Sequence, residues 1–112
     1  MSEYTSIKKD VLTRLEILLP ELRERFGIET IGIFGSVARG EDTPESDVDV
    51  LYCFQKGRGG MFDLVGLHDY LVSVFQRPVD LVSVKYISPY IVQNVKSDAV
   101  LFGAMQAIEK EC

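Results

Sequence analysis

The sequence predicts an α/β (α+β) protein in which one mixed β-sheet is flanked by helices, in a single domain over residues 1–112. Three observations predict this fold class. A length of 112 residues suits one hydrophobic core. Helical and strand-like patterns follow the order helix, strand, strand, helix, strand, helix, strand. There is no internal repeat, so one mixed sheet covered by helices is the simplest arrangement.

The first two predicted elements are a helix and a strand. Apolar residues recur at spacings of three and four over residues 5–26, which is typical of an amphipathic helix. Pro20 is expected to kink or divide this helix, and Gly27 is expected to end it. A short strand should follow over residues 28–34, where Gly32 would allow another backbone to approach closely.

The later elements are predicted from the same periodicities and from turn residues. Ser88 followed by Pro89 is a favourable helix start, because serine can cap the helix and proline suits its first position. The predicted segments are a turn with a small helix over 35–40, a strand over 47–54, a helix over 61–75, a strand over 79–84, a helix to about 97, a brief strand over 99–102 and a short helix or tail over 103–112.

Composition and charge limit the function classes. The chain is 46% hydrophobic and 26% charged, which is typical of a globular domain, and it contains no run approaching the roughly 20 apolar residues of a membrane span. The polar N-terminus resembles no secretory signal, so a cytoplasmic location is expected. A net charge of −5 argues against direct nucleic-acid binding and favours a protein partner or a small nucleotide.

The turn at Gly35 and Ser36 is a candidate phosphate site. It connects a predicted strand to a predicted helix start, where unpaired N–H groups and the helix dipole favour an anion. Ser36 adds a hydroxyl donor, and Gly35 has no side chain to hold a phosphate away. Arg39 could neutralise phosphate charge, although an ion pair with Glu41 or Asp42 is the competing interpretation. The lysine and Ser/Thr of a P-loop do not follow.

Three aspartates form a candidate metal site. Asp47 and Asp49 alternate along a predicted strand and should project to one side, where their charges repel unless a cation lies between them. Mg²⁺ is suited to such a site, because it usually takes one or two carboxylates together with substrate phosphates. Asp80, in a later strand-like run, supplies a third carboxylate. A lone Asp-x-Asp pair can also be a solvated strand end.

Together with the glycine-serine turn, these carboxylates predict metal-assisted phosphoryl or nucleotidyl transfer with two Mg²⁺ ions. In this interpretation Asp47 and Asp49 hold the ions and the triphosphate. Asp80 lies beside the attacking hydroxyl, as a ligand or as a base. The substrate would be a nucleoside triphosphate.

The combined motifs resemble the minimal nucleotidyltransferases of the DNA polymerase beta superfamily, over roughly residues 12–102. The resemblance rests on three segments: Gly35-Ser36-x-Ala38-Arg39-Gly40, Ser46-Asp47-x-Asp49 and Pro78-Val79-Asp80-Leu81-Val82. It implies a polymerase-beta-like fold, in which Gly35 and Ser36 bind nucleotide phosphates and the three aspartates are the carboxylate triad for Mg²⁺. Glu41 and Asp42 make the intervening loop unusually acidic for a triphosphate site.

The resemblance also implies a partner. The sequence resembles small family members that are antitoxins paired with HEPN-domain toxins. Some of these transfer AMP from ATP to a tyrosine of the toxin. The leading hypothesis is therefore an antitoxin that adenylylates a HEPN-type partner. One alternative is a non-catalytic nucleotide-binding module that neutralises its partner by association. Another is transfer to a small molecule, with a second subunit of a homo-oligomer or a partner covering the acceptor.

Overall fold

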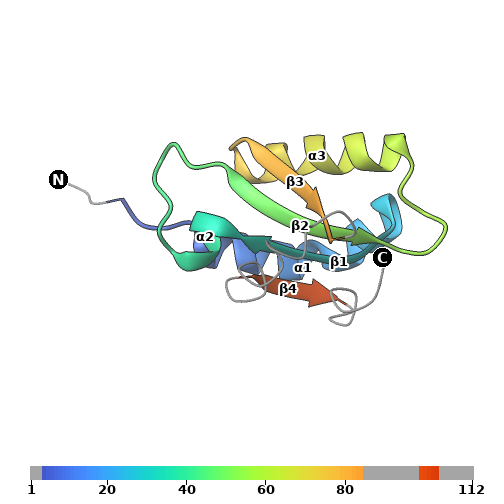
Figure 1. The fold of residues 1–112 in the computed structure, drawn as a ribbon, viewed down its shortest axis with the longest axis horizontal. Helices are drawn as coiled ribbons and strands as arrows, with labels where there is room; N and C mark the ends of the chain where they lie inside the picture. Colours follow the sequence, from blue (N-terminus) through green and yellow to red (C-terminus); the bar gives the residue numbers. More distant parts are fainter. Residues whose placement is uncertain (1–3, 85–98, 104–112) are drawn as a thin grey trace.

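The computed structural model describes residues 4–84 and 99–103 (Figure 1). Four strands form one sheet in the order β3-β2-β1-β4. Strand β1 pairs antiparallel with both β2 and β4, whereas β2 and β3 are parallel, so the predicted mixed sheet is confirmed. The elements are α1 (Lys8–Phe26), β1 (Ile28–Phe34), α2 (Gly35–Arg39), β2 (Val48–Phe54), α3 (Met61–Phe75), β3 (Val79–Ser83) and β4 (Val100–Gly103).

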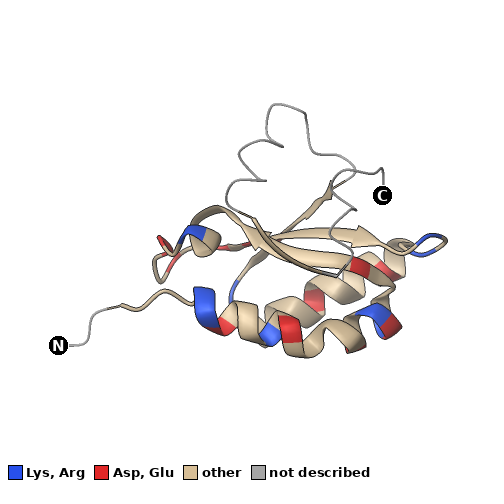
Figure 2. Ribbon diagram, turned by 90° about the horizontal axis from the view of Figure 1, so that it is seen from below, with Lys and Arg blue, Asp and Glu red and all other residues tan. Residues whose placement is uncertain are grey.

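The core lies between the sheet and the two long helices, which share one face of the sheet (Figure 2). The ring centroids of Phe26 in α1 and Tyr70 in α3 are 5.6 Å apart, which joins the helices to each other. Alternate strand residues face this core, as the period of two requires. The core residues are Val11, Leu15, Leu22 and Phe26 of α1, Leu67, Leu71 and Phe75 of α3, Val37 and Ala38 of α2, and Ile28, Ile31, Ile33, Val48, Val50, Tyr52 and Val79 of the strands.

Helix α1 differs from its prediction at two points. It begins at Lys8 rather than at residue 5, because the chain just before it is held by hydrogen bonds to Asp42. It also continues through Pro20 as one helix, so the expected division is wrong. Proline removes one hydrogen bond of the helix, and the burial of Leu15 and Leu22 on either side keeps the helix docked.

Other expected features are confirmed. Gly27 ends α1 with a left-handed φ of 72° and donates its N–H to the carbonyl of Leu22. A Cβ at Gly32 would lie 2.2 Å from the carbonyl oxygen of Val100, so this glycine does allow β4 to approach. The bounds of β1 and α3 match their predictions. The helix predicted from Ser88 lies outside the described residues, as do residues 104–112 of the predicted tail. Gly103, where that tail was expected to begin, is instead the last residue of β4.

In the described ranges, no helix is both long and apolar enough to cross a bilayer.

Candidate active site

Strand register brings two of the predicted aspartates together. In β2, Val48 and Val50 face the core, so Asp49 between them faces away from α1 and α3. The Cα of Asp49 pairs with Phe34 of β1 on one side and with Asp80 of β3 on the other. Residues paired in register carry their side chains on the same face of a sheet. The carboxylates of Asp49 and Asp80 therefore share the face opposite the helices.

The glycine-serine turn lies against Asp49. Gly35 follows β1 directly and has a left-handed φ of 73°, which favours glycine. A Cβ placed on Gly35 would be 2.3 Å from Oδ2 of Asp49. Close approach of a phosphate was the expected reason for this glycine, and the structure adds another, because a side chain here would collide with the Asp49 carboxylate. The predicted phosphate turn and the predicted metal ligand are thus in direct contact.

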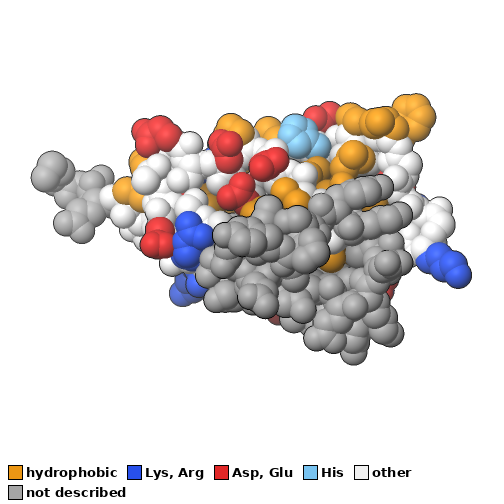
Figure 3. Space-filling view, in the orientation of Figure 1, with side chains coloured by type: hydrophobic (Ala, Val, Ile, Leu, Met, Phe, Trp, Pro, Cys, Tyr) orange, Lys and Arg blue, Asp and Glu red, His pale blue; other side chains and the backbone are white. Residues whose placement is uncertain are grey.

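Asp47 reaches the same end of the sheet from a loop. It was predicted to begin the second strand, but β2 starts one residue later, at Val48. The charge of Asp47 nevertheless acts on Asp49. Figure 3 shows acidic side chains gathered where β2 and β3 begin, with a basic side chain beside them at α2. The two segments that carry Asp47, Asp49 and Asp80 therefore meet at the end of the sheet next to α2.

The electrostatics of Asp49 reflect this crowding. Burial raises the pKa of the half-buried Asp49 carboxyl, the negative charges of Asp80 and Asp47 raise it further, and the charge of Arg39 lowers it. Among the described residues, no hydrogen bond or ion pair joins Asp49 or Asp80 to a side-chain donor. The site therefore carries negative charge that the described side chains do not neutralise by direct contact.

The donor set fits Mg²⁺ in its chemistry. All three side chains offer carboxylate oxygens, which Mg²⁺ prefers, and Asp47 and Asp80 are exposed to solvent. In the part of the chain that the structure describes, no three acidic, histidine or cysteine side chains are arranged as a ready ligand cluster. Asp47, Asp49 and Asp80 therefore do not form a ligand cluster of three by themselves. Mg²⁺ usually binds proteins through one or two carboxylates together with waters and substrate phosphates.

Arg39 and Ser36 lie in α2. Nε of Arg39 is 2.8 Å from Oε1 of Glu41, so the competing ion-pair interpretation is correct for Glu41 and not for Asp42. Both side chains of this pair are exposed, and such pairs contribute little to stability. Arg39 also lowers the pKa of Asp49, which places its charge within electrostatic reach of the carboxylates. Ser36 is half-buried in the first turn of α2.

Asp42 is a residue whose surroundings the sequence did not reveal. It was expected to add to the acidity of the loop at the triphosphate site, but it is only 6% exposed and accepts hydrogen bonds from Tyr4, Ser6 and Ile7. These partners lie more than 30 residues away in the sequence, so no local pattern could have indicated them. The acidity of this loop therefore does not all face the predicted triphosphate site.

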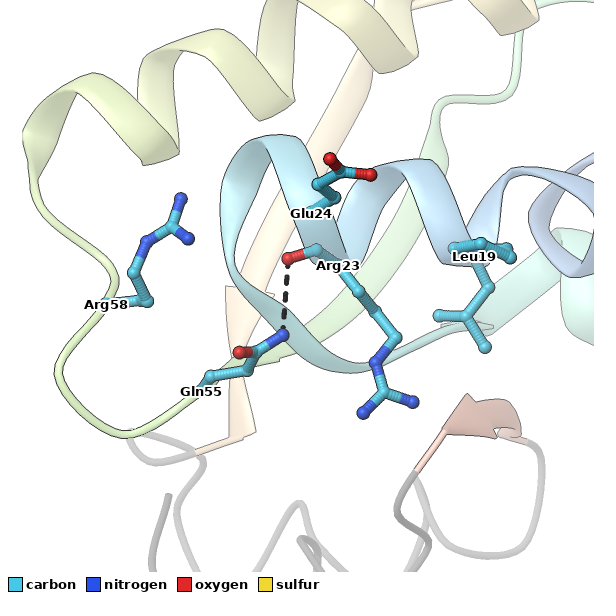
Figure 4. Close-up of a pocket in the computed structure, with 6 residues that line it drawn as sticks. Leu19, Arg23, Glu24, Gln55 and Arg58 are labelled. Atoms are coloured by element: carbon cyan, nitrogen blue, oxygen red, sulfur yellow. Dashed lines mark hydrogen bonds between the residues drawn. The ribbon is translucent and has the colours of Figure 1, made fainter.

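An open pocket of about 580 Å³ lies elsewhere, where β2 ends (Figure 4). Its lining contains none of the predicted site residues. The amide of Gln55 donates to the backbone carbonyls of Arg23, at 3.2 Å, and Ile28, at 3.0 Å, and so joins the loop after β2 to the end of α1. The lining residues are Leu19, Pro20, Arg23, Glu24, Gln55 and Arg58.

Comparisons with known proteins agree with this geometry. Residues 15–102 match the nucleotidyltransferase domain family. The protein adenylyltransferase MntA of Thermococcus cleftensis is 39% identical over 80 residues, which cover 71% of this chain and 80% of that protein. A solved structure assigned as a minimal nucleotidyltransferase has a TM-score of 0.70 at 33% identity, covering 83% of this chain and 93% of that chain.

A more distant likeness concerns the fold alone. A chain in the structure of a tri-AMPylated HEPN toxin of Shewanella oneidensis in complex with an MNT antitoxin has a TM-score of 0.59 at 21% identity. The match covers 87% of this chain and 76% of that chain. The polymerase-beta-like fold expected from the motifs is confirmed by these neighbours. Because the family match spans most of its length, the chain belongs to the nucleotidyltransferase domain family and is a minimal nucleotidyltransferase.

Proposed function

We propose that this protein is a Mg²⁺-dependent protein adenylyltransferase that transfers AMP from ATP to a tyrosine hydroxyl of a HEPN-type toxin and thereby acts as its antitoxin. One observation carries the proposal: strand register places Asp49 between the Gly35 turn and Asp80. The relative from Thermococcus cleftensis, a protein adenylyltransferase, supports the reaction class. The tri-AMPylated toxin bound to an MNT antitoxin in the Shewanella complex supports the choice of partner.

Each site residue would have a separate role in the transfer. Gly35 and Ser36 would hold the triphosphate through backbone N–H groups and a hydroxyl, and Arg39 would approach it from the end of α2. Asp47 and Asp49 would hold the Mg²⁺ ions, with Asp80 completing the set or acting as the base. Bound Mg²⁺ would supply charge neutralisation of the phosphates and activation of the attacking oxygen.

The transfer balances without a further reactant. The tyrosine oxygen of the partner forms a bond to the α-phosphorus of ATP, and the bond between that phosphorus and the bridging α,β-oxygen breaks. Pyrophosphate leaves with the electron pair of that bond. The tyrosine proton passes to a carboxylate at the acceptor side, for which Asp80 is the candidate because it lies on the edge strand of the described sheet.

Labelling of the partner tests this proposal. The protein is incubated with Mg²⁺, ATP labelled at the α-phosphate and the HEPN-domain protein encoded beside it. We expect label on the partner, located to tyrosine by mass spectrometry. Asp47→Asn with Asp49→Asn should abolish labelling, and a tyrosine-to-phenylalanine change in the partner should do the same. Labelling that persists in the aspartate variant would contradict the assigned site.

The same variant separates catalysis from simple association. If the double aspartate variant protects cells from the partner as well as the parent at equal concentration, the protein neutralises its partner without transferring AMP. If protection is lost while the two proteins still bind each other, transfer is the protective event. A cytoplasmic location and a homo-oligomeric state remain predictions from the sequence.

A further inference from the structure

Asp42 caps the first helix from a distant loop. It lies in the loop between α2 and β2, and its carboxylate accepts the backbone N–H of Ile7 at 3.1 Å. The hydroxyls of Tyr4 and Ser6 also donate to it, and Oγ of Ser6 accepts the N–H of Lys8 at 3.1 Å. The N-terminus of α1 has no cap from its own Ncap side chain, so Asp42 satisfies the Ile7 N–H directly, and Ser6, which donates to Asp42, satisfies that of Lys8.

Arg77 holds the same loop from its other side. Its Nη1 donates to the carbonyl oxygens of Thr43, at 2.7 Å, and Ser46, at 3.2 Å. Its Nη2 donates to the Tyr4 hydroxyl at 2.7 Å, and its guanidinium lies 5.6 Å from the centre of the Tyr4 ring. The Tyr4 hydroxyl therefore accepts from Arg77 while donating to Asp42. Hydrogen bonds in which the donor or the acceptor is charged are stronger than those between neutral groups.

The residues on either side of Asp47 are held in place by the segment that precedes β3. Strand pairing fixes Asp49 and Asp80, but Asp47 lies just outside β2 and has no such support. Its two neighbours are both anchored to the segment before β3. The carbonyl of Ser46 accepts from Arg77, and the N–H of Val48 donates to the carbonyl of Pro78 at 3.0 Å. Arg77 and Pro78 directly precede Val79 and Asp80.

We propose that Tyr4, Ser6, Asp42 and Arg77, here called the loop clamp, are positioning residues that set Asp47 relative to Asp49 and Asp80. This inference deepens the proposed function and rests on it for the role of Asp47. None of the four residues needs to touch substrate. Arg77 acts through the Ser46 carbonyl, and Asp42 and Tyr4 act by holding the loop against α1. Residues that orient metal ligands commonly affect metal affinity or activity by about 10- to 100-fold.

Arg77→Met is the main test, because it removes every polar contact of the guanidinium and keeps a side chain of similar length. We expect about a tenfold or greater rise in the Mn²⁺ concentration that half-saturates the protein with ATP bound, and a similar fall in kcat with little change in the KM for the partner. Arg77→Lys keeps the charge and should recover part of the loss. Arg14→Met is the matched control, because Arg14 forms an exposed ion pair with Asp10 on α1, away from the loop.

Amide hydrogen exchange distinguishes positioning from a general loss of stability. In Arg77→Met, exchange should accelerate at residues 43–48 while β1 keeps its protection. Tyr4→Phe, which keeps the ring, should show the same pattern more weakly. Uniformly faster exchange across the sheet, or unchanged Mn²⁺ binding in Arg77→Met and Tyr4→Phe alike, would overturn the inference. If the parent binds Mn²⁺ and ATP but transfers no AMP, the proposed function fails while the metal and exchange measurements still decide the role of the clamp.

Discussion

The two ends of β2 differ in how their polar groups are satisfied. After its C-terminal end, Arg58 pairs with Asp63 at 3.3 Å and donates to the carbonyl of Arg25 at 3.2 Å, and Gln55 bonds two further carbonyls. At its N-terminal end, Asp49 lies beside Asp80 and against Gly35. The described residues supply neither of these carboxylates with an ion pair or a side-chain donor.

This difference distinguishes a structural network from a binding site. Groups that hold the fold together are paired within the chain, as at the C-terminal end. Carboxylates of like charge placed side by side reduce the stability of the chain alone and become favourable only when a cation binds. The pocket of about 580 Å³ lies at the C-terminal end of β2, where polar groups are internally paired, and the chemistry is expected at the N-terminal end.

The largest expected effect on AMP transfer comes from neutralising the Asp49 carboxylate at the N-terminal end of β2. Asp49→Asn should lower the rate of AMP transfer by at least about 100-fold, because removing a preorganised electrostatic group commonly costs that much. The same change removes repulsion with Asp80, so the Tm of the protein without metal should be unchanged or higher. Single-turnover labelling and thermal unfolding measure the two quantities. A variant that is unstable and active would reverse this assignment.

A second prediction separates backbone strain from the contact with Asp49. Gly35→Ala and Gly40→Ala both place a side chain at a φ of 73°, but only at Gly35 would the new Cβ meet the Asp49 carboxylate. Each change should lower the free energy of unfolding by about 1 kcal/mol, because alanine disfavours the left-handed backbone. Gly35→Ala should lose more, and its transfer rate should fall about tenfold or further as Asp49 is displaced.

Gly40→Ala is the control for Gly35→Ala, because a Cβ at residue 40 has no heavy atom within 4 Å. It should retain most of the activity. Equal effects of the two changes on unfolding and on transfer would show that the close approach of Asp49 to Gly35 has no functional consequence.

A third, smaller effect concerns acid stability at Asp42. Burial acts to raise the pKa of Asp42, but hydrogen bonds from Ser6, Tyr4 and Ile7 outweigh it, so the pKa is lowered in the folded protein. A carboxyl group whose pKa is lowered on folding stabilises the folded protein at pH values above its pKa in the unfolded chain, which is about 4. This stability is lost as the pH falls through the pKa of the group in the folded protein. Asp42→Asn should therefore be less stable than the parent at pH 7.

The pH series makes this prediction specific. The difference in Tm between Asp42→Asn and the parent should shrink as the pH falls below about 4, because the parent loses its ionised contribution there. Glu41→Gln, next to it but exposed, should show no comparable convergence. A difference that stays constant with pH would mean that the ionised form of Asp42 makes no special contribution.

The smallest effect is expected at the C-terminal end of β2. Arg58→Met removes the bonds to Asp63 and to the carbonyl of Arg25. The pKa of Asp63 is lowered mainly by the hydrogen bond from Arg58 and then by that from the Gly59 N–H. In the variant, the pKa of Asp63 should therefore rise. The Tm of the variant should fall slightly, and its rate of AMP transfer should not change. Loss of transfer without unfolding would place part of the function in the pocket that Arg58 lines.

The candidate site was predictable in its members but only partly in its arrangement. Gly35, Ser36 and the three aspartates follow from short motifs, because the turn and the strand alternation are local properties of the chain. The position of Asp47 outside β2, and its anchoring through Ser46 and Val48, depend on bonds to Arg77 and Pro78. Such bonds connect segments about 30 residues apart, and a local pattern carries no information about them.

By itself, the sequence determined where most helices and strands lie, because hydrophobic periodicity and glycine stops act over a few residues. It also determined the family, through the spacing of its motifs. Only the tertiary structure decided the strand order β3-β2-β1-β4, the continuity of α1 through Pro20 and the burial of Asp42. The physical reason is that each of these depends on which distant surfaces are buried together, and packing outweighs the local preference of a proline or a polar loop.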